Sequence, residues 1–166
     1  MTRHLIALLL FCGLVTAASA SSSDDSFIVS GHSIGPIPLG RTLAEIEETL
    51  GAPAKTYTDV HAYVWYPRKP SGPLMAVIGP EGKSSEVKTC WDVYYATPGG
   101  RLHVGMLEDD VRGILGRPLK TSQWSHFKVL RYRGISFTVD LNNVRIVTCV
   151  AVTPTPMLRA DTPIGR

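Results

Sequence analysis

The chain has 166 residues, of which 44% are hydrophobic and 19% charged, and its formal net charge is +3. Its length suits a single folded domain. A net charge this small points to no class of partner, and the sequence names no reaction.

The first twenty residues carry the pattern of a cleaved secretory leader. Arg3 and His4 precede an apolar run over residues 5–15, and Ala18-Ser-Ala20 follows as a small-residue cleavage site. The run is too short to span a bilayer comfortably. An uncleaved anchor and a lipoprotein lipidated at Cys12 are the alternatives, and the bulky Phe11 argues against the second. We therefore expect export to the periplasm or the medium, with a soluble mature chain.

The stretch Gly31-His-Ser-Ile-Gly35 matches G-x-S-x-G, the turn that presents the nucleophilic serine of α/β-hydrolases. That turn requires a helix after the serine, and Pro36 and Pro38 prevent a regular helix there. We interpret residues 33–40 as an extended lead-in, with three apolar side chains covering the helix and the sheet: Ile34, Ile37 and Leu39.

The remaining candidates for chemistry have simpler interpretations. No pair among His32, His61, His103 and His126 has the spacing of a zinc site. The chain has no phosphate-binding loop and no dinucleotide-binding fingerprint. We expect no catalytic residue, no metal site and no small-molecule cofactor, so the protein is predicted not to be an enzyme.

The chain contains an internal repeat. Residues 40–56 align with residues 105–121 without a gap, and both glycines, a leucine, a proline and the closing Lys-Thr are identical. Val87-Lys-Thr-Cys90 then aligns with Ile146-Val-Thr-Cys149. The offset falls from 65 to 59 residues between these two matches, and Pro67–Pro73 is the obvious place for about six extra residues.

Each repeat begins with a short helix. In the first, Thr42 is predicted to cap the helix together with Glu45, and Gly51 and Pro53 to end it. In the second, Leu107 occupies the cap position. Glu108, Asp109 and Asp110 follow it and place negative charge at the helix start, where the helix dipole favours it.

Alternating side chains predict three strands after each helix. They cover residues 61–66, 74–78 and 86–95 in the first repeat, and residues 128–132, 135–139 and 144–152 in the second. The predicted fold class is α+β: two tandem repeats, each a short helix followed by a three-stranded antiparallel meander, packed together as one globular unit.

The predicted organisation is a leader at residues 1–20, a first repeat at 21–95, a second repeat at 96–154 and a loose tail at 155–166. Charge is unequal between the halves of the mature chain. Residues 21–92 hold six Lys and Arg against nine Asp and Glu, net −3, whereas residues 93–166 hold ten against five, net +5. This asymmetry indicates either an acidic partner for the second half or two differently solvated surfaces.

We predict a disulfide between Cys90 and Cys149, which occupy equivalent places in the repeats. Equivalent residues meet only where a two-fold axis passes between them, so the two cysteine strands should pair antiparallel. Alternation then predicts a set of residues on the cysteine side of these strands: Lys88, Asp92, Tyr94, Arg145, Val147 and Ala151. The competing interpretation is that the repeats are related by translation and that both cysteines are free thiols. A further alternative is that the two cysteines ligate a metal together with two histidines.

The stretch from Ile34 to Pro53, which reads I-G-P-I-P-L-G-R-T-L-A-E-I-E-E-T-L-G-A-P, resembles small exported bacterial modules. It is similar to the SmpA/OmlA-type lipoproteins of the outer-membrane β-barrel assembly machine and to the β-lactamase inhibitory protein family, which is built from two such units in tandem. Residues 105–118 repeat the pattern. The resemblance implies a protein-binding role, without a lipid anchor because the lipidation cysteine is missing.

We therefore expect an exported, non-enzymatic module of the bacterial envelope or medium that binds a protein, with no nucleic-acid partner and at most peripheral membrane contact. An inhibitor of a secreted enzyme is the first alternative, with Pro67–Pro73 as the inserting loop. An accessory factor in outer-membrane assembly is the second. The residues expected to bind the partner are Arg68, Lys69, Tyr94, Arg131 and Arg133.

Overall fold

A computed structural model describes residues 27–67, 72–90 and 94–155. These residues contain two α-helices, α1 (Leu43–Leu50) and α2 (Glu108–Leu115), and one 3₁₀ turn, η1 (Thr58–Val60). Eleven strands complete the described fold: β1 (Ile28–Val29), β2 (Ser33–Ile34), β3 (Ile37–Pro38), β4 (Lys55–Tyr57), β5 (Ala62–Trp65), β6 (Leu74–Ile78), β7 (Ser84–Cys90), β8 (Lys120–Gln123), β9 (Phe127–Arg131), β10 (Ile135–Asp140) and β11 (Val147–Val152).

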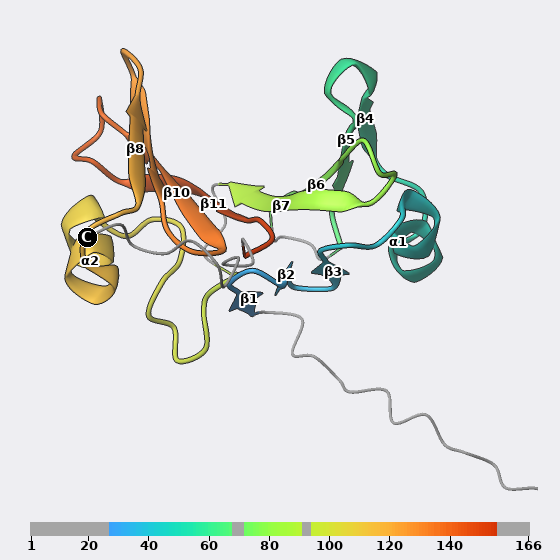
Figure 1. Ribbon diagram of the computed structural model, residues 1–166, viewed down its shortest axis with the longest axis horizontal. Helices are drawn as coiled ribbons and strands as arrows, with labels where there is room; N and C mark the ends of the chain where they lie inside the picture. Colours follow the sequence, from blue (N-terminus) through green and yellow to red (C-terminus); the bar gives the residue numbers. More distant parts are fainter. Residues whose placement is uncertain (1–26, 68–71, 91–93, 156–166) are drawn as a thin grey trace, which may run out of the picture.

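Eight strands form one antiparallel sheet in the order β4-β5-β6-β7-β11-β10-β9-β8. The strand order runs outward from the central pair β7 and β11 in the same way on both sides (Figure 1). The central pairing is antiparallel and sets Cys90 directly opposite Cys149. The antiparallel meeting of the two cysteine strands, which the predicted disulfide required, is thus confirmed.

The predicted fold class is wrong. The described chain is mostly β, with two helices, an eight-stranded sheet and a separate three-stranded sheet, rather than two helix-plus-three-stranded-meander repeats. Two edge strands, β4 and β8, were missed because their side chains are almost all exposed and show no apolar alternation. The short sheet of β1, β2 and β3 was expected only as an extended lead-in.

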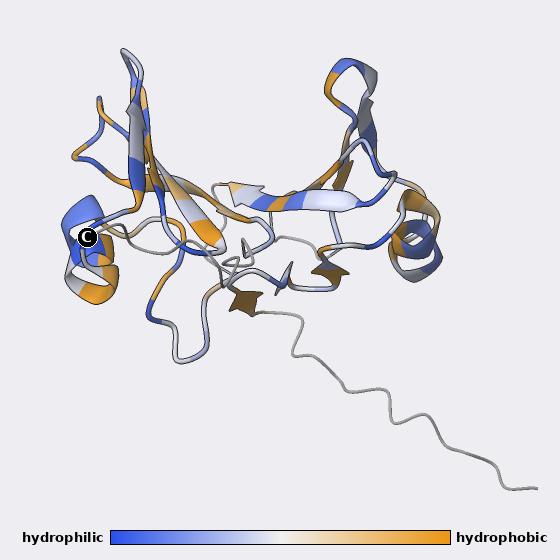
Figure 2. Cartoon of the chain, viewed as in Figure 1, coloured by the Kyte–Doolittle hydropathy of each residue, from blue (hydrophilic) through white to orange (hydrophobic). Residues whose placement is uncertain are grey.

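The three-stranded sheet covers one side of the eight-stranded sheet. Ile34 and Ile37 are fully buried, as the lead-in interpretation predicted, and lie in the same core as Val87 and Val150. Figure 2 shows β1 and β3 coloured as hydrophobic beneath the sheet. Two hydrogen bonds connect the lead-in to the start of β7. The backbone N–H of Gly40 donates to the carbonyl oxygen of Ser84, and the backbone N–H of Arg41 donates to Ser84 Oγ.

The helix ends follow the sequence signals. Thr42 accepts a hydrogen bond from the backbone of Glu45, whose carboxylate accepts one from the backbone N–H of Thr42 at 2.8 Å, so the predicted capping box is confirmed. Leu107 occupies the N-cap position of α2, and its side chain makes no capping hydrogen bond. The glycine that follows each helix accepts a hydrogen bond from an aromatic side chain. Trp65 Nε1–H donates to the carbonyl of Gly51 after α1, and the Tyr132 hydroxyl donates to the carbonyl of Gly116 after α2.

Candidate partner-binding face

One face of the eight-stranded sheet packs on the core and the other, called here the open face, does not. On β7, Val87 and Thr89 are buried in the core, whereas Lys88 and Cys90, which alternate with them, are partly exposed on the opposite side. The outer strands of both halves rise from β7 and β11 in Figure 1, and α1, α2 and the β1–β3 sheet lie on the other side. The open face is therefore the concave one.

A single row of paired residues crosses the open face from edge to edge. Following the register through all eight strands, the row reads Lys55, Val64, Met75, Lys88, Ala151, Ser136, Arg131 and Lys120. Four of its eight residues are basic and none is acidic. In the part of the chain that the structure describes, none of these four cations forms an ion pair.

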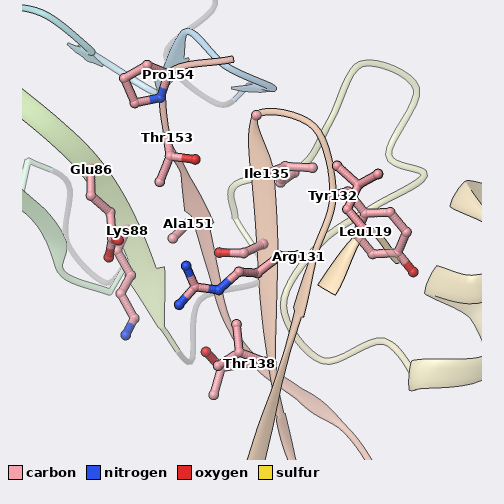
Figure 3. A pocket seen from close by; sticks show the side chains of 13 residues that line it. Glu86, Lys88, Leu119, Arg131, Tyr132, Ile135, Thr138, Ala151, Thr153 and Pro154 are labelled. Atoms are coloured by element: carbon pink, nitrogen blue, oxygen red, sulfur yellow. The ribbon is translucent and has the colours of Figure 1, made fainter. Parts of the chain in front are cut away.

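A hollow of about 280 Å³ lies on the half of the open face that β9, β10 and β11 contribute. Lys88 and Arg131 line it, together with the hydroxyl side chains of Ser136, Thr138 and Thr153. In Figure 3 the Arg131 side chain extends over the strand that carries Ala151, toward the side on which Lys88 lies. Glu86 is the acidic residue among those lining this hollow.

A second hollow of about 260 Å³ lies on the other half of the face. Tyr57 and Tyr66 border it, Lys55 and Cys90 contribute to it, and Lys88 lines both hollows. The two tyrosines are 47% and 43% exposed. Rigid aromatic rings with a polar tip are enriched where proteins bind one another.

A further aromatic pair stands beyond the first hollow, at the tip of the β8–β9 hairpin. The rings of Trp124 and Phe127 stack with centroids 4.8 Å apart. They remain 49% and 40% exposed. Exposed aromatic rings therefore flank the basic row at both ends, on the β4–β5 side and on the β8–β9 side.

The Cys90–Cys149 disulfide crosses the centre of the open face. The cysteines are direct cross-strand partners with Cα atoms 4.0 Å apart, and the structure contains the bond that the sequence predicted. Both are partly exposed on this face. The bridge fixes the two halves of the face against each other.

A buried carboxylate with two basic partners lies away from the open face. Glu108, at the start of α2, is 2% exposed and accepts a hydrogen bond from Nε of Arg112 at 2.8 Å, and it forms an ion pair with Lys128 of β9. Burial by itself raises the pKa of Glu108, but the hydrogen bonds with Lys128 and Arg112 outweigh it, so the pKa lies below its ordinary value. This arrangement anchors α2 to the sheet.

The predicted partner-binding residues do not lie together. Arg131 belongs to the basic row, but Arg133 is in the turn before β10, where its carbonyl accepts a hydrogen bond from Ser30. Tyr94 is 38% exposed and packs edge-on against Tyr95. Arg68 and Lys69 lie outside the described residues. A role of these residues in binding stays a prediction.

The predicted cysteine side of the central strands is correct only in part. Lys88 and Ala151 share that side with the disulfide. Val147 does not, because the register shifts between Thr138 and Val139 and turns Val147 into the core. Arg145 precedes β11 with a left-handed backbone, and Asp92 lies outside the described residues.

The structure shows the surroundings of the serine in the G-x-S-x-G match. Ser33 sits in β2, nearly buried, and pairs with Pro38 of β3 instead of preceding a helix. Within residues 27–67, 72–90 and 94–155, no group of three or more His, Cys, Asp and Glu could hold a metal ion. No helix in these ranges has both the length and the hydrophobicity needed to cross a bilayer.

Three cations of the basic row, Lys55, Lys88 and Lys120, were not predicted to bind the partner, although Lys88 was expected on the cysteine side of its strand. A signal for two of them was present, because the repeats both close on Lys-Thr, at residues 55–56 and 120–121. These dipeptides open β4 and β8, the two edges of the sheet. Without recognising the edge strands, neither lysine could be placed on the same face as Arg131.

Comparisons with known proteins give two distant structural similarities. No family model matches the chain, and no curated protein matches it. Among solved structures, the chain is similar to a DUF4309 family protein (YjgB) from Bacillus subtilis, with 10% identity, a TM-score of 0.49, and coverage of 69% of this chain and 78% of that one. It is also similar to a cysteine-rich secretory protein (SAV1118) from Staphylococcus aureus, with 10% identity and a TM-score of 0.46 over 69% of this chain and 44% of that one.

Proposed function

We propose that the protein is an exported, non-enzymatic module that binds a partner protein across its open face. The observation that carries the proposal is the combination, on one concave face, of unpaired cations and exposed aromatic rings. The core of a typical protein interface is rich in aromatic residues and Arg, and hot spots concentrate in such residues.

Export is supported by two features of the chain. The first twenty residues have the pattern of a secretory leader, and the structure contains a disulfide, which persists in oxidising compartments. The sequence resemblance to exported bacterial modules points to the same compartment. Export limits the partner to proteins of the envelope, the medium or the surface of another cell.

The rigidity of the face also favours a binding role. An eight-stranded sheet braced by a central disulfide presents its side chains from fixed strand positions. A preorganised surface loses little conformational entropy when a partner docks.

Site-specific photo-crosslinking in the producing cells tests this proposal. A benzophenone amino acid at Val129 or Thr138, which line the hollow of the open face, should yield one defined cross-linked species. The same group at Glu48 or Arg117, exposed near the ends of α1 and α2, serves as the matched control. Cross-linking of the same species from the helix positions, or none from the open face, would contradict the proposal.

Inhibition of a secreted enzyme is the second candidate. The insertion Pro67–Pro73 lies in sequence between β5 and β6. Tyr66, which precedes it, and Pro73, its last residue, line the second hollow of the open face, where a partner would dock. Replacing it with a short turn should abolish any inhibition while leaving open-face cross-linking intact, and unchanged inhibition would exclude the loop.

A further inference from the structure

We propose that the partner contributes an acidic loop, and that a carboxylate of this loop is held between Lys88 and Arg131 over a floor formed by Ala151 and Ser136. This inference rests on the proposed function and names the partner's chemistry at the open face. The juxtaposition follows from the sheet register, which sets Lys88 opposite Ala151, Ala151 opposite Ser136, and Ser136 opposite Arg131.

The spacing of the two cations suits one anionic group between them. Three strand spacings of about 4.8 Å separate Lys88 from Arg131, or roughly 14 Å between their backbones. Both side chains are long, and the Arg131 side chain extends toward the side of the hollow on which Lys88 lies (Figure 3). The two residues between them, Ala151 and Ser136, have small side chains and leave space above the sheet.

The chemistry of the hollow is that of a carboxylate site. Arg131 offers a planar fork that pairs with a carboxylate, and Lys88 offers a point charge. Hydroxyl groups of Ser136, Thr138 and Thr153 add donors around the same space. Glu86 lines the hollow too, yet it forms no ion pair with either cation in the described residues. Both cations are therefore available to an incoming acid.

The rest of the row favours a peptide segment over a small anion. Lys55 and Lys120 continue the row to both edges of the sheet, far beyond the reach of one small ion. A loop lying along the row would cross all eight strands and place several acidic side chains near successive cations. The complementary fields would also speed the encounter of the two proteins.

The test is a titration of the isotopically labelled mature chain by NMR with a synthetic peptide of ten glutamates. The amides of Lys88, Ala151, Ser136 and Arg131 should shift in a saturable manner, and a peptide of ten glutamines should leave them unchanged. K88Q and R131Q should each weaken binding about fivefold, the equivalent of roughly 1 kcal/mol. The double variant K88E/R131E should abolish it.

The matched control is R101E/R117E, which changes the net charge equally at two exposed positions off the open face. Its affinity for the glutamate peptide should lie within about twofold of the wild-type affinity, because surface charges remote from a site are screened by salt. Equal loss in the two double variants, or shifts spread away from the row, would overturn the inference. Far-UV circular dichroism confirms that each variant is folded.

Two further outcomes separate this inference from its rivals. If inorganic phosphate shifts the same amides as strongly as the peptide does at equal charge, the hollow is a small-anion site and the acidic loop is excluded. If the glutamate peptide fails to bind while photo-crosslinking still maps a partner to Val129 and Thr138, the acidic loop is excluded and docking on the open face stands.

Discussion

Glu108 places a carboxylate in the interior between α2 and β9, compensated by Lys128 and Arg112. Because its pKa in the folded state lies below the ordinary value of 4.5, its contribution to stability is present above that pH and is lost as the pH falls through the folded-state pKa. Removing one partner of a buried ion pair costs about 3 kcal/mol, since the other charge stays uncompensated.

We expect Glu108→Gln to lower the free energy of unfolding by about 3 kcal/mol at pH 7. Urea denaturation should show the difference from the wild type shrinking as the pH is lowered from 7 toward 3, because the wild-type carboxylate becomes protonated. Glu48→Gln, at an exposed site on α1, should change stability by less than about 0.5 kcal/mol. A difference that stays constant over this pH range would show that the ion pair contributes nothing.

Gly134, in the turn between β9 and β10, touches the lead-in closely. Its backbone has φ +72°, and a Cβ there would lie 2.7 Å from the backbone nitrogen of Gly31, whose N–H bonds to the Gly134 carbonyl. Gly82 has the same φ with open space around it. The two positions therefore share the backbone strain and differ in the steric clash.

We expect Gly82→Ala to cost about 1 kcal/mol, the strain of a left-handed alanine. Gly134→Ala should cost about 2 kcal/mol more, because the clash is with backbone that β1 and β2 hold in place. Thermal unfolding of the two variants side by side measures this difference. Equal costs would mean that the lead-in does not pack on the β9–β10 turn as described.

Among the secondary-structure elements, the central strand pair β7 and β11 joins the two halves of the sheet. Its disulfide closes a loop between residues separated by 59 positions, and a loop of that length restricts the unfolded chain by about 4 kcal/mol. The double variant Cys90→Ser/Cys149→Ser should lose about that much in urea denaturation and should remain able to fold. A loss below about 1 kcal/mol would show that the strand pairing alone fixes the two halves.

The elements that the sequence predicted are those with strong local signals. The capping box at Thr42, the strand over residues 74–78 and the cysteine pairing are all present, because each depends on a short pattern or on the repeat. The edge strands β4 and β8 were missed because exposed polar side chains pair with a neighbour through the backbone alone. Backbone hydrogen bonding of this kind produces no pattern in the hydropathy of the sequence.

The candidate face could not be predicted for a related reason. Arg131 was expected to bind a partner, but its row contains residues from eight strands spread over the chain, from Lys55 to Ala151. A register shift of one residue would move every one of these side chains to the other face. The register shift between Thr138 and Val139 is an example. Simple alternation from Cys149 would place Val147 on the open face, but the shift places it in the core.

Taken as a whole, the molecule is a curved sheet with one covered and one open face. The covered face holds the buried residues of the lead-in and of both helices, including Ile34, Ile37, Ile46 and Val111. The open face holds the disulfide, the basic row and the flanking aromatic rings. We propose that a partner protein occupies this open face.

Hydroxyl-radical footprinting of the cross-linked or purified complex tests that claim most directly, because exposed aromatic side chains react readily and report their own burial. We predict that Tyr57, Tyr66, Trp124 and Phe127 become protected when the partner is bound. Val29 and Leu107, exposed outside the open face, should react as in the free protein. Protection of Val29 and Leu107 with unchanged reactivity of the four aromatic residues would contradict the account.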